Sequence, residues 1–242
     1  MVPLGRPEMV LLDLDGTLVD SVPDLAWCVD VMMRTLGLPE RGEAEVRNWV
    51  GNGVERLVRR ALTGRLDGEP DPELFERAYP VFLECYAENT SRRSRLYPGV
   101  REGLDWLRAQ GYPLGCVTNK AARFTEPLLQ ALGIRDYFGI VVSGDSLPKK
   151  KPDPLPLLHA AEHFGAAPER SLLVGDSISD VRAARAAGFR VACVRYGYNH
   201  GQDIRTAQPD AVIDRLDELR GLIAARAEEK RGAGSWELGA GS

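Results

Sequence analysis

The sequence predicts an α/β fold in which a parallel sheet carries helices on both faces and an all-helical domain is inserted after the first strand. Two patterns support this prediction. Short apolar runs alternate with segments of helical period along most of the 242 residues, which is typical of a parallel sheet covered by helices. Between residues 21 and 96 the strand-like runs stop and only helical periodicity continues. The expected core is therefore Rossmann-like, with a separate helical insert.

Apolar runs place six buried strands at residues 9–12, 113–118, 139–143, 171–175, 190–194 and 211–213. Helical periods are expected at residues 121–132, 154–164, 179–187 and 215–229. Ligands of open parallel sheets bind beyond the carboxyl ends of the strands, so chemistry is expected at that edge.

Three helices are predicted in the insert. The first has Ser21 as N-cap with Asp24 completing a capping box, and it ends at Gly37. The second ends at Gly64, and the third contains Pro80 as a kink. The resulting domains are the α/β core (1–20 and 97–226), the helical cap (21–96) and a tail expected to be disordered (227–242).

Composition narrows the class of partner. The chain has 31 Lys and Arg against 35 Asp and Glu, a formal net charge of -4, which argues against nucleic acid and anionic membranes as partners. No apolar run approaches the roughly 20 residues that span a bilayer, and the N-terminus lacks a signal-peptide layout, so a cytoplasmic location is expected. The four cysteines lie far apart without a CxxC pair, which predicts buried thiols rather than zinc ligands or disulfides.

The strongest chemical signal is Asp13-Leu14-Asp15-Gly16-Thr17, directly after the first apolar run. Residues two apart on a strand point to the same side, so Asp13 and Asp15 can converge. Paired carboxylates are costly without a cation or a shared proton between them, and Gly16 permits a sharp turn with free amides. The alternative is a pair of N-cap residues at an ordinary strand–helix turn.

Three further signals follow predicted strands. Thr118 and Asn119 offer a hydroxyl and helix-start amides to a phosphate, or a simple N-cap. Lys151 can neutralise a phosphate and a carboxylate, or belong to a solvated basic loop. Asp176 and Asp180 lie one helical turn apart and suit Mg²⁺, or merely complement a helix dipole.

Together these positions resemble the haloacid dehalogenase-like (HAD) superfamily. Asp13 and Asp15 match its first motif and Thr118 its second; Lys151 matches the third, and Asp176 with Asp180 the fourth. The resemblance spans essentially residues 9–220, and the helical insert is similar to the cap of that superfamily's phosphatases. Within the superfamily, LLDLDGTLVDSVPDL and Trp49-Val50-Gly51-Asn52-Gly53 resemble the bacterial phosphoglycolate phosphatases.

The resemblance implies hydrolysis of a small phosphorylated metabolite, 2-phosphoglycolate, through an aspartyl-phosphate on Asp13. Asp15 would donate a proton to the leaving alkoxide and later accept one from water. It also implies Mg²⁺ between Asp13, the backbone carbonyl of Asp15 and Asp176.

In the same scheme Thr118, Lys151 and the amide of Asn119 hold the phosphoryl oxygens. Asp180 orients Lys151 or a metal-bound water. The cap segment Gly51-Asn52-Gly53 is a candidate for the substrate carboxylate. Arg59 or Arg60 is an alternative source of charge for that carboxylate, although both are expected to face solvent.

Alternatives within the superfamily are a phosphosugar phosphatase and a phosphoglucomutase-like enzyme, which would use the same aspartates. A dehalogenase has no need of the acid at Asp15. A phospho-accepting receiver would be about half as long and lack the insert, and a non-catalytic binding protein would not need every motif residue. Either a monomer or a homodimer is compatible with the sequence.

Overall fold

The computed structural model describes residues 4–223, and its centre is a six-stranded parallel sheet. The strands are ordered β5 (Ile140–Val142), β4 (Leu114–Val117), β1 (Met9–Leu12), β6 (Ser171–Gly175), β7 (Arg190–Val194) and β8 (Ala211–Ile213). Each neighbouring pair is parallel. The predicted fold class and all six predicted strands are confirmed.

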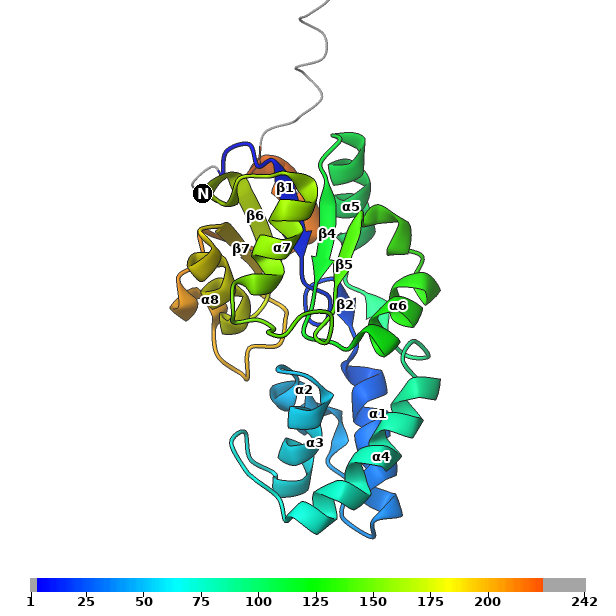
Figure 1. Ribbon diagram of the computed structural model, residues 1–242. Coiled ribbons are helices and arrows are strands. Elements are labelled where there is room, and N and C mark those ends of the chain that lie inside the picture. The colour runs from blue at the N-terminus through cyan, green and yellow to red at the C-terminus, as the bar shows by residue number, and fades with distance from the viewer. Residues whose placement is uncertain (1–3, 224–242) are drawn as a thin grey trace, which may run out of the picture.

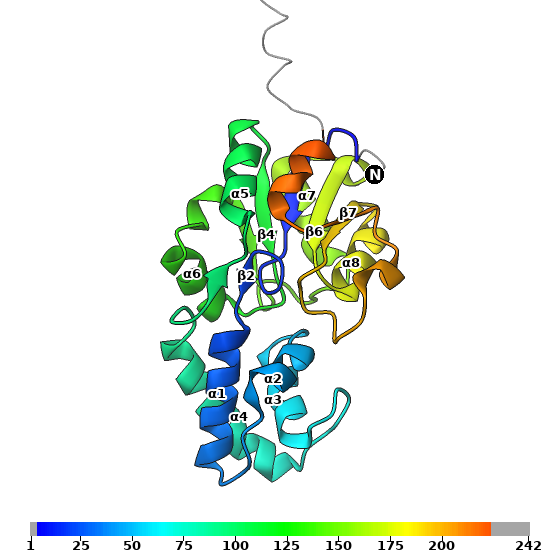
Figure 2. The same cartoon turned by 180° about the vertical axis from the view of Figure 1, so that it is seen from behind.

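Helices cover both faces of the sheet because its strands are apolar on both sides. Met9 and Leu11 of β1 pack with α7 (Leu155–Phe164) and α8 (Ile178–Ala187). Val10 and Leu12 point to the other face, towards α5 (Val100–Ala109) and α6 (Ala122–Ala131). Figure 1 shows α7 in front of the sheet, and Figure 2 shows the opposite face. All the carboxyl ends of the strands therefore meet at one edge.

The insert between β1 and α5 contains four helices beside that edge (Figure 1): α1 (Val22–Thr35), α2 (Gly42–Trp49), α3 (Val54–Thr63) and α4 (Pro72–Glu88). They enclose their own apolar core, to which Met32, Val58 and Phe82 contribute. Phe124 of α6 and Tyr198 join the same cluster, so the helical insert packs against the α/β core.

Two short strands carry the chain between the core and the insert. β2 (Val19–Asp20) pairs with β3 (Arg95–Leu96) in an antiparallel ribbon. The two connections therefore lie side by side. Neither strand was predicted, because two residues leave no pattern of apolar alternation.

Other differences concern helices. α2 was not predicted, and residues 215–229 were expected to be α-helical, whereas Leu216–Gly221 form a 3-10 helix. Shorter 3-10 turns occupy Arg135–Tyr137, Pro168–Arg170 and Ile204–Ala207. Residues beyond 223, including the predicted tail 227–242, lie outside the described residues. None of the helices within residues 4–223 combines the length and apolar character needed to cross a bilayer.

The capping box predicted at Ser21 and Asp24 is wrong. The Ser21 side chain makes no cap hydrogen bond. The buried Asp24 carboxylate instead accepts hydrogen bonds from the amides of Arg93 and Ser94 and from the Ser94 hydroxyl, at 2.7–2.9 Å. Asp24 therefore ties α1 to the segment leading into β3. The four cysteines are free thiols. Cys28, Cys116 and Cys193 are buried, as expected, whereas Cys85 is half-buried, and its Sγ lies 3.0 Å from Cys28 Sγ.

Candidate active site

One pocket lies between the carboxyl edge of the sheet and the helical insert. The structure brings all seven candidate residues to its lining, although they are distributed over four strand ends: Asp13, Asp15, Thr118, Asn119, Lys151, Asp176 and Asp180. The insert contributes residues 50–54 from the α2–α3 connection to the same pocket. The parallel topology explains this convergence, because it places the residue after each strand at the same edge.

A tight turn after β1 sets the spacing of the acidic residues. The Asp13 amide donates to Val174 O at 2.9 Å, which extends the β1–β6 ladder by one residue. Gly16 then adopts a φ of 85°, in the left-handed region that favours glycine. A Cβ at Gly16 would lie 2.3 Å from Asp176 Oδ2. The turn therefore brings the backbone directly against Asp176, to which Thr17 Oγ1 also donates at 3.1 Å.

Lys151 is the central cation of the pocket. Its ammonium donates to Val117 O and Asp180 Oδ1, each at 2.7 Å, and lies 2.9 Å from Asp13 Oδ1. Burial alone would lower the pKa of Lys151, but the negative charges of Asp13 and Asp180 outweigh burial and raise it. Lys151 therefore stays charged and fixed beside Asp13, and the solvated basic loop considered for it is wrong.

Asp13 and Asp176 are buried carboxyls close to one another and to Asp180, and the charge of Lys151 does not offset their burial. Burial raises the pKa of Asp13 to about 6 although Lys151 opposes the shift. Burial, followed by the charges of Asp180 and Asp13, raises the pKa of Asp176 well above its usual value. Asp13 Oδ1 forms an ion pair with Lys151, but no donor within residues 4–223 is aligned to give it a hydrogen bond. A second cation would relieve this crowding.

Carboxylate oxygens of Asp13, Asp176 and Asp180 lie within 4.8 Å of one another, a spacing that suits a metal ion. The oxygens of Asp180 are already used: Oδ1 accepts from Lys151, and Oδ2 accepts from the amide and hydroxyl of Ser177 in a capping box of α8. Asp176 also accepts hydrogen bonds, from Thr17 Oγ1 and the Tyr198 amide, but among the described residues it has no ion-pair partner, whereas Asp180 pairs with Lys151. Asp13 and Asp176 are therefore better placed than Asp180 to hold a cation, and hard carboxylate oxygens fit a hard divalent cation.

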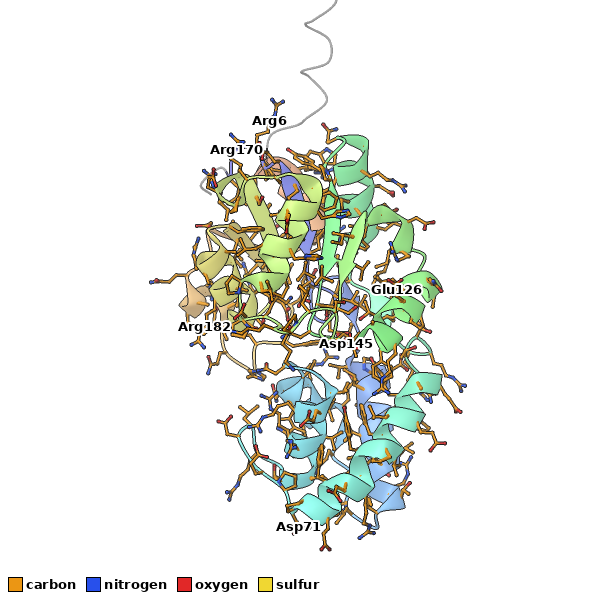
Figure 3. All side chains as sticks on the ribbon, viewed as in Figure 1. Arg6, Asp71, Glu126, Asp145, Arg170 and Arg182 are labelled. Carbon is orange, nitrogen blue, oxygen red and sulfur yellow. The ribbon has the colours of Figure 1, made fainter. Side chains whose placement is uncertain are left out.

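Thr118 and Asn119 shape the turn after β4. The Thr118 hydroxyl accepts from the Lys120 amide at 3.2 Å, and the Asn119 side chain donates to Lys151 O at 2.9 Å. Asp145, labelled in Figure 3 at the end of the core facing the insert, accepts from the Ala122 amide at the start of α6. These bonds join the loops after β4 and β5 into one rim.

Lys120 is a site residue to which the sequence analysis gave no role. Its ammonium lies 3.1 and 3.2 Å from the two carboxylate oxygens of Asp15 and 2.5 Å from the Tyr86 hydroxyl. Burial opposes its charge, but the charge of Asp15 and the Tyr86 hydroxyl outweigh burial and raise the pKa of Lys120. No local pattern could have revealed this pair, because Lys120 and Asp15 are 105 residues apart.

The connection between α2 and α3 borders the pocket and has an unusual backbone conformation. Gly51, Asn52 and Gly53 have φ angles of 126°, 68° and 93°. The buried Arg60 donates to Trp49 O at 2.7 Å and to Gly51 O at 3.2 Å. The expectation that Arg60 faces solvent is therefore wrong, because the loop's carbonyl groups need a donor.

From the core side, Lys150 Nζ donates to Asn52 O at 3.0 Å, and His200 Nδ1 lies 2.9 Å from Asn48 O. These contacts join the loop of the insert to the rim of the sheet. Arg59 instead pairs with Glu55 and Glu69 outside the pocket.

Comparison with known proteins gives concordant results. The family model described as haloacid dehalogenase-like hydrolase matches residues 10–194. A Nitrosococcus oceani protein named phosphoglycolate phosphatase is 65% identical over 224 residues, covering 93% of this chain and 100% of the relative. A Nitrosospira multiformis protein of the same name is 54% identical over 216 residues, covering 89% of this chain and 95% of the relative.

Among solved structures, a crystal structure described as a predicted phosphoglycolate phosphatase from Haemophilus somnus superposes with a TM-score of 0.82 at 39% identity. The match covers 88% of this chain and 96% of that chain.

Proposed function

Because the chain belongs to the haloacid dehalogenase-like hydrolases, we propose that it is a phosphatase that hydrolyses 2-phosphoglycolate to glycolate and phosphate. One observation carries the proposal: a carboxylate, Asp13, lies 2.9 Å from a buried ammonium at the base of a pocket that also contains a second acid, Asp15. The names of the relatives supply the substrate.

In the first step a carboxylate oxygen of Asp13 attacks phosphorus. A new O–P bond forms while the P–O bond to the glycolate oxygen breaks, and Asp15 donates its proton to the departing alkoxide. In the second step water attacks the phosphorus of the aspartyl-phosphate, Asp15 takes a proton from that water, and Asp13 is released as a carboxylate. Asp15 ends the cycle protonated, as it began.

Lys151, the Thr118 hydroxyl and the Asn119 amide bind the phosphoryl oxygens that do not react. Lys151 is pinned by Val117 O and Asp180, so its charge is in place before substrate arrives and costs no reorganisation. Asp180 acts as a positioning residue for Lys151.

Mg²⁺ is the proposed cofactor, held by Asp13, Asp176 and the backbone carbonyl of Asp15. When bound, it supplies positive charge that offsets the repulsion between the Asp13 carboxylate and the phosphate dianion. The grouping of the Asp13, Asp176 and Asp180 carboxylates within 4.8 Å supports this assignment. Burial and the neighbouring carboxylates also raise the pKa of Asp13 and of Asp176, and a bound cation would oppose that shift.

The cap would contribute substrate selection. We assign the substrate carboxylate to the amides of Gly51, Asn52 and Gly53, since residues 51–53 line the pocket and their positive φ angles suit a turn whose amides can face an anion. The proposed setting is cytoplasmic, with a monomer or homodimer acting on free metabolites and no nucleic acid partner, as the net charge of -4 favours.

The test is phosphate release from a panel of small phosphomonoesters, with Mg²⁺ or with EDTA, for the wild type and Asp13→Asn. We expect 2-phosphoglycolate to give the highest kcat/KM, and both EDTA and the substitution to abolish release. Release that survives both would refute the mechanism. A preference for sugar phosphates would refute the substrate, and a requirement for a bisphosphate activator would indicate a mutase.

A further inference from the structure

The Lys120 ammonium connects the proposed acid–base residue with the cap. It lies at the carboxyl end of β4, buried, with contacts of 3.1 and 3.2 Å to Asp15 Oδ1 and Oδ2. Because both oxygens of one carboxylate contact a single nitrogen, the plane of the Asp15 carboxylate is fixed. The Lys120 side chain is 2% exposed and that of Asp15 18%, so water screens the attraction between their charges less than it does for a surface pair.

The third contact of Lys120 comes from the insert. Its Nζ lies 2.5 Å from the hydroxyl of Tyr86 on α4, and 4.8 Å from the centre of that ring. Tyr86 is fully buried, and its ring lies 4.8 Å from that of Phe124 on α6 and 5.6 Å from that of Phe82 on α4. Tyr86 can therefore reach Lys120 only while α4 packs against the core.

We propose that Lys120 is the positioning residue for Asp15, and that Tyr86 makes this positioning depend on contact between the cap and the core. The inference rests on the proposed function, in which Asp15 moves the proton. With the cap in place, Tyr86 and Asp15 together use the donors of the ammonium. Without the cap contact, Lys120 loses its Tyr86 partner and Asp15 loses a rigid support.

The contacts of 3.1 and 3.2 Å do not distinguish the two oxygens of the Asp15 carboxylate, but they restrict where a proton can lie once it is bound. When Asp15 is protonated, its unprotonated oxygen is the better acceptor for the Lys120 ammonium. The hydroxyl must then be on the other oxygen, free to face the leaving group. Lys120 thus orients proton donation without touching the substrate.

The leaving group distinguishes this role from a general structural one. Glycolate departs from 2-phosphoglycolate as an alkoxide and needs the proton of Asp15, whereas acetyl phosphate, of similar size, releases acetate, which needs none. For both substrates the leaving group departs when Asp13 is phosphorylated, so kcat/KM reports this step and not the later hydrolysis of the aspartyl-phosphate. General acid catalysis contributes about 10²- to 10⁴-fold, so Lys120→Met should lower kcat/KM for 2-phosphoglycolate about 10²-fold and that for acetyl phosphate only a few-fold.

Two pairs of variants test the proposal. Lys120→Met is compared with Lys149→Met, because Lys149 has an exposed side chain paired with Asp153. Tyr86→Phe, which removes a single oxygen, is compared with Tyr79→Phe on the same helix. Tyr86→Phe should show the same selectivity as Lys120→Met with a smaller loss, and both control variants should behave as the wild type.

Equal losses for the two substrates, or none, in folded Lys120→Met and Tyr86→Phe would overturn the proposal. Thermal unfolding followed by circular dichroism establishes that each variant is folded; if Lys120→Met is not, Tyr86→Phe decides the question. A wild type that hydrolyses neither substrate, or an active Asp13→Asn, would instead overturn the proposed function. The two failures are therefore distinguishable.

Discussion

Without divalent cations, the stability of this protein should fall as pH rises from about 4 to about 6. Asp176, whose pKa is also raised, contributes in the same direction, but the contribution that a substitution can isolate is that of Asp13, whose pKa is raised from 3.8 to about 6, chiefly by burial and despite Lys151. The folded chain holds this proton more tightly than the unfolded chain. Its stabilising contribution is therefore complete below the unfolded pKa and lost as pH rises through the folded pKa. Because raising a pKa by 1 corresponds to about 1.4 kcal/mol, the raised pKa of Asp13 contributes about 3 kcal/mol to the free energy of unfolding at low pH.

The assay is urea unfolding in EDTA at several pH values from 4 to 7, for the wild type and Asp13→Asn. The free energy of unfolding of the wild type should drop relative to that of the variant by about 3 kcal/mol across this range. Asp67→Asn, at an exposed carboxylate, should follow the wild type. If the free energy of unfolding differs between the wild type and Asp13→Asn by the same amount at every pH, the inference that burial raises the pKa of Asp13 is refuted.

Three further predictions concern geometry and packing. Gly16→Ala places a Cβ 2.3 Å from Asp176 Oδ2 at a φ of 85°. Because the turn or Asp176 must then move, kcat for phosphate release should fall about 10²-fold. An unchanged kcat would contradict this. Asp24→Ala strands the buried amide and hydroxyl of Ser94; it should cost about 3 kcal/mol in urea unfolding, and a neutral result would remove the proposed tie. Phe82→Ala opens a cavity in the fully buried core of the insert; it should cost about 3–5 kcal/mol by the same measurement, unless the helices collapse into the space.

The sheet could be predicted from sequence because its strands are buried on both faces, so each appears as a continuous apolar run. β1 is the clearest case, with four buried residues in succession. α2 lacks such a signal: only Val46 and Trp49 of its eight residues are buried. The ribbon formed by β2 and β3 is too short for any periodic pattern.

The same distinction applies to the site. Asp13, Thr118, Lys151 and Asp176 could be found because each follows a strand whose end the sequence locates. Lys120 could not, because its role comes from partners distant in the chain.

Asp24 shows the converse error. The local capping pattern was present, but hydrogen bonds from Ser94, 70 residues away, took the carboxylate instead. Local rules therefore find the strand ends but miss contacts between residues distant in the chain, such as the one that joins the two ends of the insert.

The paired strands β2 and β3 have one more consequence. Val19 lies opposite Leu96 and Asp20 opposite Arg95, so everything between these residues leaves and rejoins the core at a single point. A segment inserted in this way can lengthen, shrink or be replaced without displacing any strand of the sheet. The insert, to which we assign substrate selection, can thus change as a unit while the residues at the carboxyl edge of the sheet keep their positions.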